Sequence, residues 1–202
     1  MGTQQSNGPP PETHEAIMAA THRALCKHGY ANLTMKRISD EFGKSKSLLH
    51  YHYNCKEELL LSFLDHLHEK FDAKISTDDY DTATDALLFS IDALFPDPDS
   101  ESDFDIAMLE MGMQAPYNDA FRDQFQENND RLRELFADII AQGIERGEFE
   151  EDIDPERAAE RLLIFLDGVR GRGVVLGSND PNEVGREVID EFVDDICAGG
   201  DE

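Results

Sequence analysis

Two short amphipathic segments joined by a glycine turn constrain the fold of this chain more than any other feature of its sequence. Thr34 is a favoured helix N-cap, and apolar residues recur at helical spacing over residues 35–42. Gly43 ends that segment, and a second short helix is expected over about residues 45–52. Because the turn "GKS" is so short, the two helices must cross steeply. The pattern therefore predicts a helix-turn-helix unit.

The remainder of the chain also follows helical periodicity. Further helices are expected from Lys56 onward, over about 79–95 and about 103–113, after Pro116, and after Asp154 and Asp180. The last two begin with Asp-Pro, which places an N-cap before a proline in the first helical position. The sequence therefore predicts an all-α fold of about nine helices.

Basic side chains concentrate around the glycine turn of an otherwise acidic chain. The 202 residues contain 18 Lys and Arg against 44 Asp and Glu, for a net charge of −26. Residues 34–56 hold five basic and two acidic side chains, whereas residues 59–202 hold 11 and 38. A polyanion is therefore expected to meet the N-terminal part and to be repelled by the rest. Such pervasive acidity resembles that of proteins from salt-accumulating halophiles.

The second helix of the pair has a polar side and an apolar side. At 100° per residue, Lys46, Ser47, His50 and Tyr51 share one side, and Leu49 points to the core. Lysine, serine, histidine and tyrosine donate hydrogen bonds to phosphates or base edges. The residues predicted to contact DNA from both helices and their flanks are Thr34, Lys36, Lys44, Ser45, Lys46, Ser47, His50, Tyr51 and Lys56.

Residues 13–60, which include "GYANLTMKRISDEFGKSKSLLHYHYNCKEELL", resemble the DNA-binding head of the TetR family of transcriptional regulators. The features that carry the resemblance at fixed spacing are Gly29-Tyr30, Thr34, Ile38-Ser39, Gly43, Ser45-Lys46, the aromatic and histidine run at 50–53, and Lys56-Glu57. The later stretch "GIERGEFEEDIDPERAAERLLIFLDGV" is similar to the regulatory part of such proteins.

The chain departs from the family pattern at four places. Lys44 stands where the family usually has valine, and Ser47-Leu48 replaces the usual Gly-Thr. His50 replaces the first of two aromatic residues. Cys55 occupies the usual Ser or Asp cap position, so that Asn54 is the expected cap instead.

The resemblance implies a homodimeric, ligand-responsive repressor that binds a palindromic DNA operator and leaves it when a small-molecule inducer binds. Residues 1–11 are then a disordered tail, residues 12–58 the DNA-binding head, and residues 59–202 a helical ligand-binding and dimerisation domain. The dimer is expected to form through helices at about 155–177 and 181–198. No cofactor is implied.

The predicted inducer pocket rests on apolar residues that occur at helical spacing. Phe63, Leu67, Phe104, Met108, Met111 and Phe125 are candidate walls, because Met and Phe adapt to varied ligands. Residues with this spacing also form ordinary helical cores. A DNA-binding architectural protein without an inducer is therefore the alternative interpretation.

A metal site and an enzyme fit the sequence less well. His50, His52 and Cys55 form an H-x-H-x-x-C run, but residues i and i+2 of a helix point about 200° apart. No glycine-rich phosphate loop or Ser/His/Asp set indicates catalysis, and the acidic runs have the character of solvated surface. We therefore expect neither a metal site nor an enzyme.

Three scattered cysteines suit free thiols in a reducing compartment. No apolar run approaches the ~20 residues that span a bilayer, and the N-terminus lacks an apolar signal core. The expected location is the cytoplasm.

Overall fold

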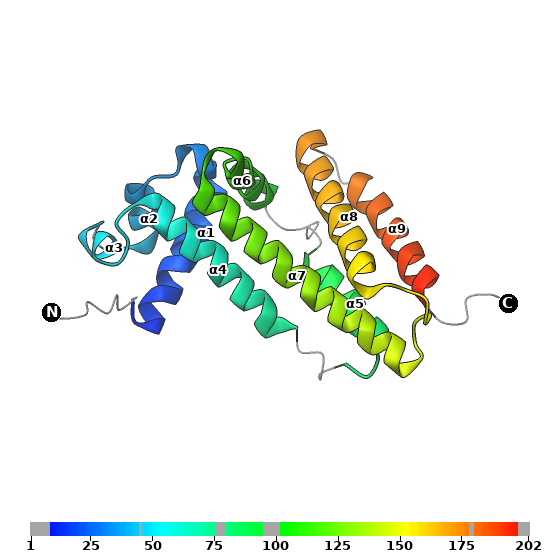
Figure 1. Cartoon of the computed structure of the whole chain (residues 1–202). Helices are drawn as coiled ribbons and strands as arrows, with labels where there is room; N and C mark the ends of the chain where they lie inside the picture. Colours follow the sequence, from blue (N-terminus) through cyan, green and yellow to red (C-terminus); the bar gives the residue numbers. More distant parts are fainter. Residues whose placement is uncertain (1–8, 45, 76–79, 95–101, 178–179, 198–202) are drawn as a thin grey trace. The chain divides into compact units, whose positions relative to one another are not determined.

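The structure, a computed structural model, describes residues 9–44, 46–75, 80–94, 102–177 and 180–197. Within these residues the chain forms nine α-helices and a short 3₁₀ turn (Figure 1). They are α1 (Pro11–Asn32), α2 (Met35–Phe42), α3 (Lys46–His52), α4 (Lys56–Lys74), α5 (Ala83–Leu94), α6 (Ser102–Gly112), η2 (Ala115–Tyr117), α7 (Asp119–Arg146), α8 (Pro155–Leu176) and α9 (Asp180–Ile196). The predicted all-α fold is confirmed. Among the described helices, none is long and apolar enough to cross a membrane.

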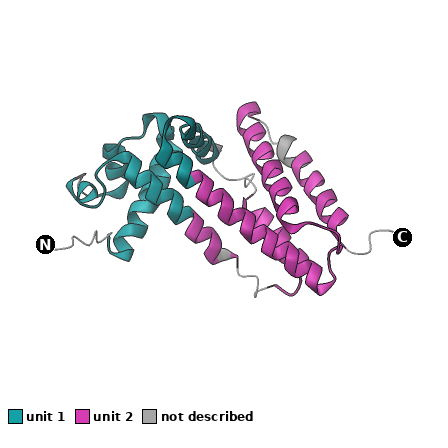
Figure 2. Ribbon diagram, viewed as in Figure 1, with its two compact units in different colours: residues 1–67, 101–124 teal, residues 68–100, 125–202 magenta. Residues whose placement is uncertain are grey.

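The chain divides into two compact units (Figure 2). Unit 1 contains residues 1–67 and 101–124, and unit 2 contains residues 68–100 and 125–202. Unit 1 thus combines the predicted head with α6, which lies far beyond it in sequence. The functional division into residues 12–58 and 59–202 stays a prediction. Residues 1–8 of the predicted tail lie outside the described residues, and α1 begins at Pro11.

In unit 1, α1 packs against α2 and α6, and α2 packs against α3. The helical backbone of α1 breaks at Gly29, where φ is 66° and ψ is 166°, a conformation that glycine adopts at little cost. Apolar side chains from α1, α2, α3, α4 and the start of α7 are buried in this unit. Those exposed by 1% or less include Ile17, Leu25, Ile38, Leu49, Leu59, Leu60, Phe63 and Phe121.

Unit 2 has its own core, formed by α5, α7, α8 and α9. Leu87, Phe136, Ile140 and Ala159 are fully buried there. After α7 the chain folds back so closely that a Cβ on Gly143 would lie 2.1 Å from the Phe149 ring.

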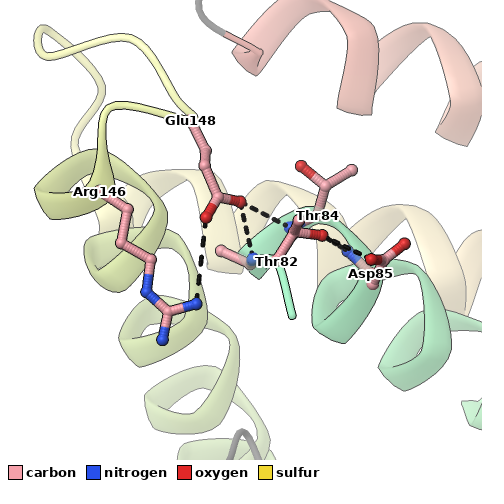
Figure 3. Close-up of polar contacts among 6 residues, drawn as sticks. Thr82, Thr84, Asp85, Arg146 and Glu148 are labelled. Atoms are coloured by element: carbon pink, nitrogen blue, oxygen red, sulfur yellow. Dashed lines mark hydrogen bonds and ion pairs between the residues drawn. The ribbon is translucent and has the colours of Figure 1, made fainter. Parts of the chain in front are cut away.

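The N-terminus of α5 is held by a carboxylate from the turn after α7 (Figure 3). Glu148 Oε2 accepts hydrogen bonds from the backbone N–H groups of Ala83 at 2.7 Å and Thr84 at 3.4 Å. The side chain of Thr82 accepts the N–H of Asp85 at 3.0 Å. Thr82 therefore caps α5. The helix predicted for about residues 79–95 begins later than expected, because these side chains fix its start at Ala83.

The two C-terminal helices begin differently. The side chain of Asp154 accepts the N–H of Arg157 at 3.2 Å, so the predicted cap of α8 is confirmed. The prediction for α9 is wrong by one residue, because Asp180 is already helical. Pro181 then occupies the second helical position, where a missing N–H is equally harmless, since the first four N–H groups of a helix have no internal partner.

Candidate nucleic-acid interface

The start of α2 presents polar and basic groups next to the first N–H groups of the helix, which have no partner within the helix itself. Thr34 caps the helix, and its hydroxyl accepts the N–H of Arg37 at 3.2 Å. Lys36 is exposed in the first helical turn. The Arg37 guanidinium donates to the carbonyl oxygen of Asn32. An exposed amine beside a helix N-terminus suits a phosphate contact.

The turn between α2 and α3 has the geometry that the glycine predicts. Gly43 adopts the left-handed conformation at φ 68° and closes α2 with a hydrogen bond to Ser39 O. The Ser39 hydroxyl then donates to Lys44 O at 2.9 Å. Lys44 is exposed, and its ammonium lies 5.2 Å from the centroid of the Phe42 ring. Ser45 lies outside the described residues.

Helix α3 turns its polar side outward and is anchored by one leucine. Leu49 is fully buried, as expected for its core-facing position. Ser47, His50 and Tyr51 are exposed, with 81% of Tyr51 accessible. Lys46 begins the helix, and its side chain lies outside what the structure describes. A buried anchor with a polar outer side is the arrangement that a groove-reading helix needs.

The run that resembles a metal site is divided between α3 and the turn that precedes α4. His50 is exposed on α3, whereas His52 is half-buried. The Cys55 thiol accepts the N–H of Glu58 at 3.5 Å and so caps α4. In the described parts of the chain, no group of three or more His, Cys, Asp or Glu is placed to hold a metal ion.

The prediction that Asn54 caps α4 is wrong. The backbone and side-chain amides of Asn54 donate to the Glu58 carboxylate at 2.9 and 2.8 Å. Asn54 therefore acts as a donor outside the helix, while the thiol of Cys55 accepts from the helix. The reciprocal arrangement resembles a capping box in which sulfur replaces the usual hydroxyl.

Lys56, predicted to contact phosphate, is turned toward the interior of unit 1. Its ammonium lies 4.3 Å from the centroid of the Tyr30 ring and donates to Tyr30 O at 3.4 Å. Burial lowers the pKa of Lys56. Burial, and secondarily the nearby negative charge of Glu57, raise the pKa of Tyr30. The phosphate contact of Lys56 stays a prediction.

The carboxylate of Glu41, within the basic region, is paired with a lysine of α1. Lys27 of α1 donates to Glu41 at 2.7 Å, and Arg23 donates to the Glu41 carbonyl at 3.0 Å. The hydrogen bond from Lys27 is the main cause that lowers the pKa of Glu41. Lys27 and Arg23 thereby reduce the repulsion that Glu41 would exert on an approaching polyanion.

Sequence reasoning missed the polar contacts that α6 and the start of α7 make with the head. Glu110 accepts hydrogen bonds from the backbone of Tyr30 and Ala31, and the Asn118 amide donates to Glu57. Glu110 lies 80 positions from Tyr30 in the chain, so no local pattern indicates the pairing.

The predicted pocket residues are not gathered in one unit. Phe63, Leu67, Phe104, Met108 and Met111 belong to unit 1, and Phe125 belongs to unit 2. Phe63 is 1% exposed and meets the Phe104 ring edge-on at a centroid distance of 6.3 Å. Met111 is fully buried. The pocket therefore stays a prediction, and the alternative of an ordinary core stays open.

A helix-turn-helix head with an exposed polar reading helix, followed by further helices, defines the class of helix-turn-helix DNA-binding regulators. Two family models match this chain: bacterial regulatory proteins of the tetR family over residues 17–63, and the C-terminal domain of BetI-type transcriptional repressors over residues 83–198. The chain belongs to the TetR family of transcriptional regulators, a family without enzymatic activity.

Solved structures and characterised relatives agree with this assignment. A TetR transcription regulator from the halophilic archaeon Haloarcula marismortui is 39% identical, with a TM-score of 0.83 over 92% of this chain and 98% of that one. A regulator from Saccharomonospora viridis, solved in complex with choline, is 23% identical, with a TM-score of 0.78 over 93% and 99%. The regulator TtgR of Pseudomonas putida is 26% identical over 82% of this chain and 81% of its own.

Proposed function

We propose that this regulator is a homodimeric repressor that binds a palindromic operator and is released by a small-molecule inducer. The exposed polar side of α3, held in place by the buried Leu49, is the observation that carries the proposal. Two copies of α3 would enter successive major grooves, about one helical turn of DNA or a multiple of it apart. The other residues predicted to contact DNA, at the start of α2 and in the turn, would fix the register through phosphates.

The α8–α9 surface supports dimerisation through these two helices. A groove of about 860 Å³ lies between them. Ile164, Leu176 and Val184 line it and are exposed by 63%, 57% and 57%. Apolar patches of this kind mark protein interfaces.

Charges on the same groove favour a second copy of this chain as the occupant. Arg161 and Arg172 line the groove together with Glu191 and Asp195. A surface that carries both signs around an apolar centre allows opposite charges to pair across a two-fold axis. Four helices, two from each copy, would then form a bundle.

The acidic second part limits how the protein meets DNA. Residues 59–202 carry 38 acidic and 11 basic side chains and would be repelled by phosphates. Only the head can then approach a duplex, and binding weakens as the salt concentration rises. The proposal places the protein in the cytoplasm, where an operator is accessible.

The inducer belongs to the proposal as well. Met108 and Phe104 of α6 are half-buried side chains of the type that lines adaptable pockets. Choline, which is bound in the Saccharomonospora viridis relative, is a reasonable first probe. If no small molecule shifts operator binding, the alternative of an architectural protein without an inducer gains support.

A selection from random duplexes with the purified full-length protein tests the proposal. The expected result is an enriched palindrome, recovered equally with and without a zinc chelator. If no palindrome is enriched, the proposed function is refuted. Loss of binding on chelation would instead support a zinc-dependent head.

A further inference from the structure

The end of α1 is joined to α6 by a carboxylate. At Gly29 the helical backbone of α1 breaks, which leaves the N–H groups of Tyr30 and Ala31 directed away from the helix. Glu110 Oε2 accepts both, at 2.8 and 3.3 Å. A Cβ on Gly29 would lie 3.2 Å from the same oxygen, so the contact is close. We call residues 29–31 the joint.

The kink at Gly29 explains the position of this carboxylate. The backbone is helical again from Tyr30 to Asn32, so the N–H groups of Tyr30 and Ala31 are the first of a short helical segment, where a negative group is favoured. Hydrogen bonds to a charged acceptor are also among the stronger ones. The placement of Glu110 therefore depends on the backbone of the joint.

Helix α4, which follows the reading helix, makes two further contacts, one with the joint and one with the start of α7. Lys56 of α4 donates to the carbonyl oxygen of Tyr30 at 3.4 Å, so a carbonyl group of the joint is hydrogen-bonded as well as its N–H groups. The Asn118 amide, at the start of α7, donates to Glu57 of α4. All of these residues lie in unit 1 (Figure 2). In the sequence, α1 precedes the helix pair α2–α3 and α4 follows it, and both α1 and α4 contact the α6–α7 region.

We propose that Glu110 is a positioning residue that holds the joint of the DNA-reading head against α6. Without its two hydrogen bonds, α1 and α2 gain orientational freedom, and the head loses the preorganisation that operator binding requires. Phe104 and Met108 lie on the same helix as Glu110, so a ligand that displaces α6 displaces this carboxylate. The inference rests on the proposed function, because operator binding is its readout.

Electrostatics alone predicts that removal of the Glu110 charge strengthens DNA binding, whereas the loss of its two hydrogen bonds to the joint should weaken DNA binding. The two explanations can therefore be distinguished by experiment. Removal of a negative charge from a DNA-binding protein strengthens binding to phosphates. Glu110→Ala removes the charge and both acceptors, whereas Glu110→Gln removes the charge and keeps an acceptor oxygen. Asp103→Asn, at an exposed position on the same helix, measures the effect of charge removal by itself.

The experiment measures the affinity of the full-length variants for the duplex enriched by the wild-type protein. We expect Glu110→Ala to weaken binding by about tenfold, the factor that corresponds to one charged hydrogen bond. Glu110→Gln should recover most of this loss, and Asp103→Asn should bind as tightly as the wild type or more tightly. In hydrogen exchange, the amides of Tyr30 and Ala31 should exchange about tenfold faster in Glu110→Ala, with a melting temperature lowered by only a few degrees.

Wild-type or stronger binding by Glu110→Ala would overturn the inference, and so would a Glu110→Gln variant as weak as Glu110→Ala. A large drop in melting temperature for Glu110→Ala without faster exchange at the joint would also overturn it, because the role would then be structural. If the wild-type protein itself enriches no duplex, the proposed function fails first. The exchange rates of the joint still report whether Glu110 holds it.

Discussion

Replacement of Ile164 by Asp should separate the proposed dimer without disturbing the fold of one chain. Ile164 lies on α8, lines the α8–α9 groove, and is 63% exposed in the single chain. Full burial of an isoleucine side chain contributes roughly 1.5–3 kcal/mol, so the exposed part is worth on the order of 1–2 kcal/mol per chain. A two-fold interface contains two copies of Ile164, so their burial contributes about 2–4 kcal/mol to the free energy of dimerisation. The buried, unpaired carboxylates of the variant would add a further penalty.

This sum corresponds to a rise in the dimer dissociation constant of at least about 100-fold. Sedimentation velocity over a range of protein concentrations measures it directly. Ile106→Asp is the matched control, because Ile106 is 38% exposed but lies on α6, whose residues do not line the α8–α9 groove. We expect the control to sediment as the wild-type dimer. An Ile164→Asp variant that dimerises with wild-type affinity would refute the assignment of the interface.

Three further substitutions test the head and the core. Leu49→Ala should lower the free energy of unfolding by about 2–5 kcal/mol in denaturant titration, because Leu49 is the fully buried residue of α3; an unchanged midpoint would contradict its role as anchor. His50→Ala should weaken operator binding by about 1 kcal/mol while sedimentation shows an intact dimer; a monomeric variant would contradict this division of roles. Gly143→Ala should lower the melting temperature, because its Cβ would lie 2.1 Å from the Phe149 ring; wild-type thermal stability would show that the ring moves aside at little cost.

Local signals in the sequence predicted much of the head. Gly43 specifies a left-handed residue at the end of α2, and Thr34 supplies the cap at its start. The buried position of Leu49 followed from helical spacing once the turn had been located. Each of these features depends on residues within one or two helical turns, where sequence spacing and spatial distance correspond.

The errors and omissions arise where distant segments or competing groups decide the outcome. Cys55 caps α4 although oxygen is the better acceptor, because Glu58 engages the amides of Asn54. The phosphate contact of Lys56 stays a prediction, and its ammonium lies against the ring and carbonyl of Tyr30, a contact that its position in the motif does not indicate. Glu110 contacts the joint at residues 29–31 only through tertiary packing, and no sequence spacing indicates this contact.

The central claim is that two copies of the head read one operator. Fluorescence anisotropy titrations of the wild-type protein, on the selected palindrome and on a duplex that keeps only one half-site, test it most directly. We expect two chains per palindrome and binding to the single half-site that is weaker by about 100-fold, because the second contact becomes intramolecular in the dimer. Equal affinity for both duplexes, or one chain per palindrome, would contradict the account.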